Sequence, residues 1–263
     1  MLVAVNVGNS IISVGFFEDF ECKLSSSFKI SSDIKRTEDE YFSIIKSICN
    51  DKGIACDIIN GVVISSVVPQ LTQKIVKTFS AFCKCEPLVV GPGIKTGFQI
   101  KIDNPSELGG DIVANAAAVM QLRQKSKCVV IADIGAVNTV SAINKQGEYL
   151  GCAIFPGIQM SLDALHGETA QLPNVNVSKA VTAIGKNSYA AISSGVLLGT
   201  VLSIDGFVEK FAQEMRCEIE ALQLIATGEF ASSAIKMSKY RFEYEEELTL
   251  KGLYYIYRNT SKQ

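Results

Sequence analysis

Two stretches of the chain alternate between apolar strands and glycine turns in the same way. Residues 3–10 read VAVNVGNS and residues 130–137 read VIADIGAV; each is an apolar run that stops at a glycine and resumes as a second alternating strand. Placing Asn6 on Asp133 aligns the two stretches without a gap. Alternation with a period of two predicts strands, and the glycine between them predicts a turn. The sequence therefore predicts one structural unit used twice, with an amide in the first copy where the second has a carboxylate.

Each copy continues into amphipathic helices and a further apolar strand. Thr37 and Glu40 form the pattern of a capping box, and Asn187 is expected to cap the longest helix. The predicted helices cover about 38–48, 71–82, 111–123, 160–166 and 188–215, and the further strands cover 61–67 and 222–229. Hairpins joined to helix-linked strands predict mixed α/β domains with partly parallel sheets. Two such domains form a cleft that suits a small ligand.

Composition and charge exclude some classes of partner. The 263 residues are 48% hydrophobic, which is enough for a large buried core. With 25 basic against 27 acidic residues, nothing favours nucleic acid or a membrane surface as a partner. The longest strongly apolar run, 195–204, is half the length of about 20 residues that a membrane span needs. No signal-peptide pattern opens the sequence, so we expect a cytoplasmic protein.

The cysteines and the single histidine are expected to be structural. Eight cysteines are scattered through a long chain, which is typical of small core residues in a reducing compartment. Cys83 and Cys85 are too close together for an ordinary zinc site, and no histidine is near them. His166 follows a helical pattern and precedes a glycine, so we interpret it as a helix-end residue.

The first glycine turn has the chemistry of a phosphate-binding turn. Gly8 lets a ligand approach the backbone closely, while Asn9 and Ser10 add an amide and a hydroxyl. All of these groups are neutral and can hydrogen-bond phosphate oxygens. A plain hairpin turn uses the same residue types, so both interpretations stay open.

A third motif, ELGGDIVANAAA at 107–118, places Asp111 at the start of a predicted helix. The helix dipole favours the charged form of a carboxylate there by about 0.3–1 kcal/mol, so we expect Asp111 to be ionised. An ionised carboxylate beside a substrate hydroxyl can accept its proton during phosphoryl transfer. A helix N-cap is the alternative role of this residue.

A fourth motif, IGKNSYAAISSG at 184–195, also opens a helix. Gly185 and Ser188 offer an amide and a hydroxyl to a polar substrate, and Lys186 adds a positive charge. Along the helix, Ala191, Gly195 and Gly199 recur every four residues and would let a second helix approach closely. The sequence leaves open whether that helix belongs to the same chain or to a partner subunit.

Taken in order, these motifs resemble a known family. NVGNS, KIDNPSELGGD, ADIGAVNT, GEYLGCAIFPGI, IGKNS and LIATGE are similar to motifs of type III pantothenate kinase, a member of the acetate-kinase/sugar-kinase/actin-like superfamily. The resemblance spans nearly the whole chain and ends around residues 248–259. Several motifs in the right order and spacing are far more specific than any one of them.

The resemblance implies a fold, a reaction and an assembly. It implies an α/β fold of two actin-like (ribonuclease H-like) domains with mixed sheets and an interdomain cleft; we expect them at 1–115, with the phosphate loop, and at 116–263. It implies transfer of the γ-phosphate of ATP to pantothenate, which gives 4′-phosphopantothenate in the first step of coenzyme A biosynthesis. It also implies Mg²⁺, a monovalent cation (K⁺ or NH₄⁺), and a homodimer with active sites at or near the interface.

The family's site residues map onto this sequence motif by motif. The loop that embraces the ATP phosphates and helps hold Mg²⁺ maps to Asn6, Val7, Gly8, Asn9, Ser10, Ile11, Ile12 and Ser13. Substrate contacts map to Ile102, Gly109, Gly110, Asp111, Ile112 and Ser188, with Asp111 as the catalytic base. Asp133 maps to the ligand of the monovalent cation, and Ala136 maps to a further ATP contact.

Several of these positions differ from the family pattern. The replacements are Asn6 for Asp, Ile102 for Tyr, Ile112 for Arg and Ala136 for Thr, and TGE at 227–229 has no second glycine. Because Asp111 and Asp133 are retained, we expect an active pantothenate kinase with an altered pocket. The alternatives are a catalytically impaired kinase-fold protein that serves as a binding or regulatory module, and a kinase for another small alcohol.

Overall fold

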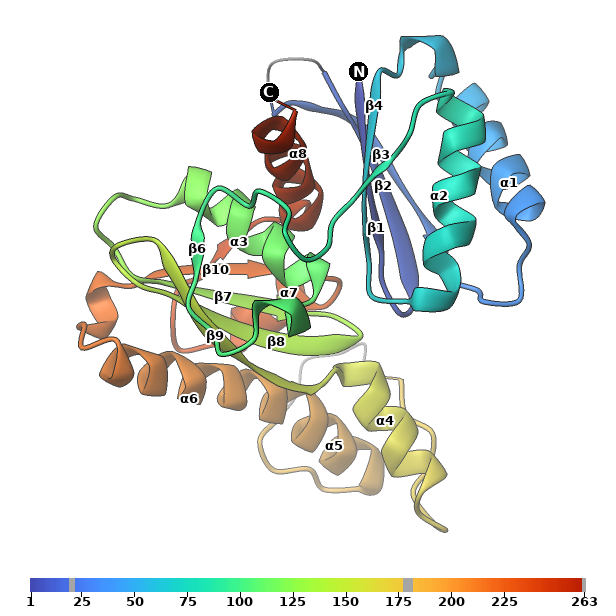
Figure 1. Ribbon diagram of the computed structural model, residues 1–263. Coiled ribbons are helices and arrows are strands. Elements are labelled where there is room, and N and C mark those ends of the chain that lie inside the picture. Colours follow the sequence, from blue (N-terminus) through green and yellow to red (C-terminus); the bar gives the residue numbers. More distant parts are fainter. Residues whose placement is uncertain (19–21, 177–181, 262–263) are drawn as a thin grey trace. The chain divides into compact units, whose positions relative to one another are not determined.

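The computed structural model describes residues 1–18, 22–176 and 182–261 and consists of two compact units (Figure 1). Unit 1 comprises Met1–Gln99, Asp103–Leu122 and Glu247–Gln263, and unit 2 comprises Ile100–Ile102 and Arg123–Glu246.

This division corrects the expected single boundary after residue 115. Helix α3 (Gly110–Leu122) runs across that position, and the C-terminal helix α8 (Leu248–Thr260) belongs to unit 1. The reason is packing, because Val113 of α3 and Leu253 of α8 share one buried apolar cluster with Leu2 of the first strand. Unit 1 is therefore built from the beginning, the middle and the end of the chain.

Unit 1 contains a five-stranded mixed sheet in the order β3-β2-β1-β4-β5. Its strands are β1 (Leu2–Val7), β2 (Ile11–Phe17), β3 (Leu24–Ser31), β4 (Gly61–Ser66) and β5 (Leu88–Val89). The β1–β2 and β2–β3 pairs are antiparallel, whereas β1–β4 and β4–β5 are parallel.

Helices cover both faces of this sheet (Figure 1). Helices α1 (Glu38–Asp51) and α2 (Pro69–Cys83) pack on the face that carries Val3, Val5 and Val7. Helices α3 and α8 pack on the face that carries Leu2 and Ala4. The alternation along β1 therefore assigns its even-numbered positions, including Asn6, to the α3 and α8 face.

Unit 2 repeats this order with one strand added. Its six-stranded sheet has the order β11-β10-β7-β8-β9-β6. The strands are β6 (Gln99–Ile100), β7 (Val129–Ile134), β8 (Val137–Ile143), β9 (Glu148–Pro156), β10 (Gln223–Thr227) and β11 (Glu243–Tyr244). Antiparallel β7–β8 and β8–β9 pairs and parallel β7–β10 and β10–β11 pairs match those of unit 1, which confirms the predicted repeat.

The repeat needs a gap of one residue, which corrects the ungapped alignment. Asn6 pairs with Ser13, seven positions later, whereas Asp133 pairs with Thr139, six positions later. The turn between β7 and β8 is therefore one residue shorter than the turn between β1 and β2. A sequence pattern of strand, glycine and strand does not reveal this difference.

The helices of unit 2 cover one face of its sheet. They are α4 (Ile158–Gly167), α5 (Ser188–Ser193), a π-helical turn (Ser194–Leu198), α6 (Gly199–Glu214) and the short α7 (Ala231–Ala234). Their apolar side chains form one cluster with residues of β7, β8 and β10. Asn187 caps α5 as predicted, because its Oδ1 accepts from the Ala190 N–H at 2.9 Å.

The continuous helix Ser188–Glu214 also corrects an expectation drawn from residues 195–204. By length and composition alone, this helix is apolar enough to cross a membrane. The expectation considered only the continuous apolar run at 195–204 and not the helical turns on either side of it. In the structure Val201, Ile204 and Val208 are buried in the core cluster of unit 2, as in a core helix of a globular unit.

The local predictions for helix ends are confirmed, whereas the prediction that most cysteines are core residues holds for only three of the eight. The capping box of α1 is present, with bonds in both directions between Thr37 and Glu40. The eight cysteines form no disulfide within the described residues; Cys49, Cys83 and Cys128 are buried, and burial raises the pKa of Cys49 to about 11, which favours the neutral thiol. His166 lies in the last turn of α4, where its Nδ1 is 3.1 Å from the Leu172 carbonyl oxygen.

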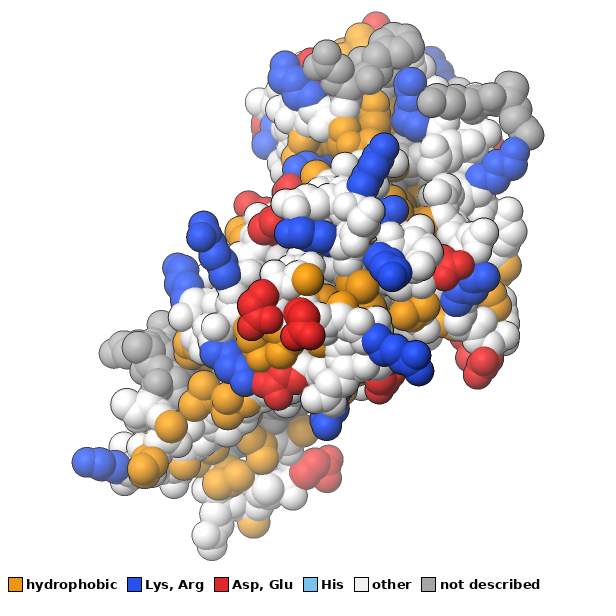
Figure 2. Space-filling view, turned by 90° about the vertical axis from the view of Figure 1, so that its left-hand side faces the viewer, with side chains coloured by type: hydrophobic (Ala, Val, Ile, Leu, Met, Phe, Trp, Pro, Cys, Tyr) orange, Lys and Arg blue, Asp and Glu red, His pale blue; other side chains and the backbone are white. Residues whose placement is uncertain are grey.

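Both charge signs appear on the molecular surface. On the face shown in Figure 2, lysine and arginine side chains are scattered, and acidic side chains stand between them.

Candidate active site

The first glycine turn links β1 to β2 within unit 1. The Gly8 N–H donates to the Ile11 carbonyl at 3.0 Å, which closes the turn. Asn9 and Ser10 are exposed at its tip, and Gly8 is half-buried. The turn therefore presents the short polar side chains of Asn9 and Ser10 outward, as in a phosphate-binding turn.

A row of three polar residues crosses the sheet just below this turn. Asn6 pairs with Ser13 of β2 and with Ser65 of β4, so the three side chains share one sheet face. Asn6 Oδ1 and Ser65 Oγ are buried and have no hydrogen-bond partner within the described residues. Such groups are rare in native proteins and commonly indicate a water, an ion or a ligand.

Helix α3 begins directly over this row. Gly110 lies so close to Ser65 that a Cβ on Gly110 would stand 2.7 Å from Ser65 Oγ. The Asp111 carboxylate folds back over Gly109 and accepts a hydrogen bond from the Ile112 N–H at 2.8 Å. Unit 1 thus contains the first glycine turn, the polar row and Asp111.

Burial controls the charge of Asp111. Desolvation raises the pKa of Asp111 above its ordinary value, and the hydrogen bonds from the Ile112 N–H and from its own N–H oppose this effect. The sequence predicted only the opposite influence of the helix N-terminus. A carboxylate with a raised pKa is a stronger base when it is ionised.

Contacts with α8 hold the remainder of α3 in place. Thr249 Oγ1 donates to Asn115 Oδ1 at 2.7 Å, four residues after Asp111. Gly252 packs on the backbone of Ala114 so closely that a Cβ there would overlap the carbonyl. Ile112, where the family pattern has Arg, is 8% exposed.

Unit 2 contains the same row with a carboxylate at its centre. Asp133 pairs with Thr139 of β8 and with Thr227 of β10, as Asn6 pairs with its two serines. Gly228 has a φ of +102°, and a Cβ on it would stand 2.6 Å from Asp133 Oδ1. Position 228 in TGE therefore favours glycine, because a side chain there would collide with the Asp133 carboxylate and would strain the backbone.

The second glycine turn packs against the start of α4. A Cβ on Gly157 would overlap the carbonyl oxygens of Gly135 and Ala136. Ala136 is half-buried and has no side-chain hydrogen-bonding group. Any contact of Ala136 with a nucleotide would therefore come from its backbone.

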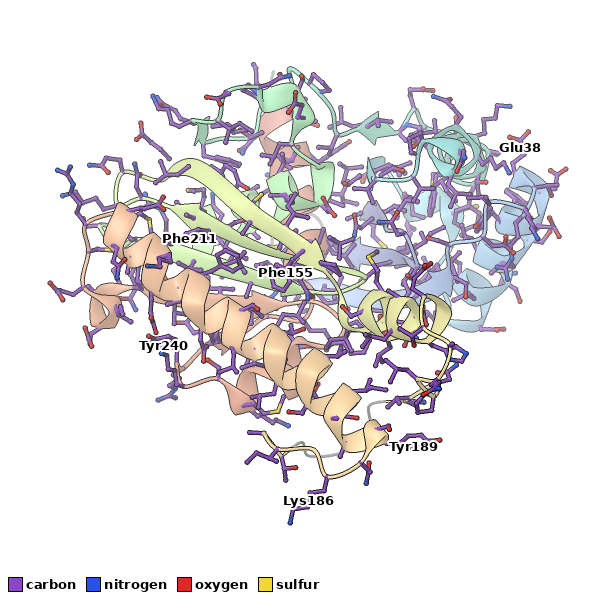
Figure 3. All side chains as sticks on the ribbon, turned by 90° about the horizontal axis from the view of Figure 1, so that it is seen from below. Glu38, Phe155, Lys186, Tyr189, Phe211 and Tyr240 are labelled. Atoms are coloured by element: carbon purple, nitrogen blue, oxygen red, sulfur yellow. The ribbon has the colours of Figure 1, made fainter. Side chains whose placement is uncertain are left out.

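Two predicted substrate residues of unit 2 lie on other elements. Ile102 is 3.9 Å from the position of a Cβ on Gly151 of β9. Ser188 is exposed at the first position of α5, with Lys186 and Tyr189 projecting beside it (Figure 3). Neither residue belongs to β7, β8 or β10, the strands that carry the row around Asp133.

Sequence reasoning missed three hydroxyl residues of the two rows, namely Ser65, Thr139 and Thr227. The available signal was a polar residue inside a buried strand, as in VVISSVV at 62–68. The pairing that places each hydroxyl beside Asn6 or Asp133 is known only from the strand register.

Known proteins resemble this chain both in sequence and in fold. The sequence matches the family described as type III pantothenate kinase over residues 2–210. The fold is similar to that of a conserved putative Baf family transcriptional activator from Campylobacter jejuni, with a TM-score of 0.62 and 17% identity over 99% of this chain and 100% of that one.

Two further solved structures share the fold. A putative 2-dehydro-3-deoxygalactonokinase from Sinorhizobium meliloti has a TM-score of 0.59 and 9% identity, with 100% of both chains covered. An activator of the 2-hydroxyisocaproyl-CoA dehydratase from Clostridium difficile, solved with bound ADPNP, has a TM-score of 0.53 and 12% identity over 98% of this chain and 95% of that one. These similarities confirm the predicted α/β fold with two mixed sheets.

Proposed function

Because the chain belongs to the type III pantothenate kinase family, we propose that it transfers the γ-phosphoryl group of ATP to pantothenate. The products are 4′-phosphopantothenate and ADP. The observation that carries this proposal is the position of Asp111, a half-buried carboxylate at the start of α3, in the same unit as the turn Gly8–Ser10. Family membership by itself supports an ATP-dependent kinase without naming the acceptor.

Asp111 supplies the proton acceptor of the proposed reaction. The pantothenate hydroxyl oxygen attacks the γ-phosphorus, its proton moves to the Asp111 carboxylate, and the bond from the γ-phosphorus to the β-phosphate oxygen breaks as ADP leaves. Gly109 and Gly110 let the Asp111 carboxylate and Ser65 Oγ pack directly against the backbone at the start of α3. The raised pKa strengthens Asp111 as a base without any second charged side chain.

The turn of unit 1 fits the phosphates of ATP. Exposed Asn9 and Ser10 offer donors, and the backbone from Asn6 to Ser13 frames them. Asn6 offers Mg²⁺ a neutral amide oxygen, which suits contact through a metal-bound water better than direct charge pairing. Mg²⁺ would neutralise charge on the transferred phosphate.

Asp133 fits a monovalent cation such as K⁺ or NH₄⁺. Its carboxylate shares a sheet face with the hydroxyls of Thr139 and Thr227. Within 1–18, 22–176 and 182–261, no group of three or more His, Cys, Asp or Glu residues could hold a metal ion. An oxygen set with one carboxylate and neutral hydroxyls or carbonyls suits a large, weakly charged cation rather than zinc.

A second candidate acceptor is a small alcohol without a carboxylate. Ile112 is buried where the family pattern has Arg, and an Arg–carboxylate bond is a charge-assisted fork. The apolar replacement favours an uncharged substrate. Ile102 likewise places an apolar side chain at a predicted substrate position where the family pattern has Tyr.

The assembly and location belong to the same proposal. We expect a homodimer in the cytoplasm, with the face of Ala191, Gly195 and Leu202 as the contact between copies. All three are exposed, and Leu202 is 59% exposed. Light scattering on a Gly195→Arg variant tests this contact, and an unchanged dimer would reject it.

A coupled kinase assay tests the proposed function. Purified protein with ATP, Mg²⁺ and K⁺ should consume ATP when pantothenate is added, and Asp111→Asn should abolish turnover. Turnover with other small alcohols but not with pantothenate would support the second candidate acceptor. Calorimetric binding of ATP without turnover of any alcohol would instead indicate a binding or regulatory module.

A further inference from the structure

Ser32, which follows β3, makes two hydrogen bonds to the phosphate turn. Its Oγ donates to the Gly8 carbonyl oxygen at 2.5 Å. Its backbone N–H donates to the Ser10 carbonyl oxygen at 2.9 Å. One residue outside the turn therefore binds carbonyls at both ends of the tripeptide 8–10.

The neighbouring carbonyls of the hairpin are also bonded inside the protein. The Val7 carbonyl accepts from the Val67 N–H at 3.0 Å. The Ile11 carbonyl accepts from the Gly8 N–H at 3.0 Å. Together with Ser32, these bonds engage four carbonyl oxygens around the turn.

This pattern determines which end of the peptide dipoles faces a ligand. A carbonyl oxygen repels a phosphate oxygen, whereas an N–H attracts it. The Gly8 carbonyl and the Asn9 N–H belong to one peptide plane, so the bond from Ser32 Oγ to this carbonyl holds the Asn9 N–H on the opposite side, available for an anion. Loss of the bond to the Gly8 carbonyl would free that peptide plane to rotate toward the ligand.

Ser32 is itself held firmly. The next residue, Asp33, donates its N–H to Tyr41 Oη at 2.9 Å and accepts from the same hydroxyl at 3.0 Å. Lys74 Nζ donates to the carbonyls of Ile34 and Arg36, each at 2.8 Å. Helices α1 and α2 therefore fix the segment 32–36 against the turn.

We propose that Ser32 is a positioning residue for nucleotide binding, which holds the Gly8–Asn9 peptide with the Asn9 N–H directed at the phosphates. This role rests on the proposed kinase function, since it concerns the same ATP site. Ser32 does not touch the nucleotide and acts through the Gly8 and Ser10 carbonyls.

The test compares Ser32→Ala with Ser25→Ala. Ser25 lies on β3, the strand that ends just before Ser32. Its Oγ likewise donates to a backbone carbonyl, that of Phe16, at 3.0 Å. ATP affinity is measured by calorimetry with Mg²⁺, and KM for ATP and for pantothenate is measured in the coupled assay. Thermal unfolding of both variants reports their stability.

Ser32→Ala should weaken ATP binding by about threefold to tenfold, the range expected for one hydrogen bond. Its KM for pantothenate should stay unchanged, and Ser32→Thr, which keeps the hydroxyl, should restore ATP affinity. Ser25→Ala should lose a similar amount of stability without losing ATP affinity. If both variants bind ATP like the wild type, or if both lose affinity equally, the positioning role is rejected.

ATP binding by the wild-type protein distinguishes a failure of this inference from a failure of the proposed function. Absence of ATP binding by the wild type overturns both. ATP binding by the wild type with an unaffected Ser32→Ala variant overturns only the role of Ser32.

Discussion

Gly110 lies against the side chain of Ser65, and a Cβ on Gly110 would stand 2.7 Å from Ser65 Oγ. Gly110→Ala should therefore destabilise the protein by about 1–3 kcal/mol through overpacking and should lower kinase activity, because α3 carries Asp111. The double variant Gly110→Ala/Ser65→Ala should recover most of the stability, since it removes the clashing oxygen. A double-mutant cycle in urea checks this coupling, and purely additive effects would contradict the contact.

The half-buried carboxylate of Asp111, the proposed catalytic base, also lowers the stability of the fold through its desolvation. Its pKa is raised in the folded state, so the folded protein holds this proton more tightly than the unfolded chain. The contribution of this carboxyl group to the free energy of unfolding therefore falls as pH rises. The fall begins near pH 4, the pKa of the group in the unfolded chain, and ends above its raised pKa in the folded protein. Asp111→Asn should abolish turnover and still melt at a higher temperature than the wild type at pH 7.

A pH series of melting curves provides the control for Asp111→Asn. The advantage of the variant should shrink as pH is lowered below the folded pKa of Asp111, where the wild-type carboxyl is also neutral. Asparagine can keep the hydrogen bond from the Ile112 N–H, so loss of that bond does not confuse the comparison. A variant less stable than the wild type at pH 7 would refute the assigned cost of burial.

The Asn6→Asp substitution tests the effect of a carboxylate charge at position 6. Asn6 Oδ1 is buried without a partner in the described part of the chain, so a carboxylate there would lack a compensating group in the absence of metal. We expect lower stability without Mg²⁺ and at least about tenfold tighter Mg²⁺ binding in the presence of ATP. Calorimetry at several Mg²⁺ concentrations measures both effects, and unchanged Mg²⁺ and ATP binding would show this interpretation to be wrong.

Asp133→Asn should affect the monovalent cation rather than ATP. The substitution keeps the size of the side chain beside Gly228 but removes the charge that would attract K⁺. Activation by K⁺ should be lost or should require at least about tenfold more salt, while ATP affinity should change little. Rates measured over a KCl series, with ionic strength held constant by a large organic cation, decide this prediction.

The contact between α3 and α8 predicts a large stability effect. Gly252→Ala would place a Cβ into the backbone of Ala114, which should destabilise the protein by at least about 3 kcal/mol. Gly206→Ala in α6 is the matched control, because no atom lies within 4 Å of its Cβ position. That variant should be stabilised by roughly 0.5–1 kcal/mol through helix propensity. Similar unfolding midpoints for the two variants would contradict the close crossing.

Features that depend on nearby residues were predictable from the sequence. The capping box of Thr37 and Glu40 and the cap at Asn187 involve residues three positions apart, and both are confirmed. The strand repeat was visible because its glycines and its apolar alternation recur. Its two turns differ in length by one residue, and this difference appears only in the strand register.

Features that depend on distant residues were not predictable. Gly252 and Ala114 are far apart in the sequence, so nothing local assigned α8 to unit 1. The helix N-terminus at Asp111 was visible, but its burial was not, and burial determines the direction of the pKa shift. Ser65 became a candidate only when the parallel register placed it beside Asn6.

The return of α8 to unit 1 has a consequence for how the protein folds during synthesis. The first strands of unit 1 are translated early, but one face of their sheet is covered in part by Leu250, Leu253 and Ile256 of α8, which are translated after all of unit 2. Unit 2, whose residues lie between, is translated completely before that cover exists. This sheet face therefore lacks the apolar side chains of α8 while unit 2 is translated, and we expect the non-local docking of α8 to be a late step of folding.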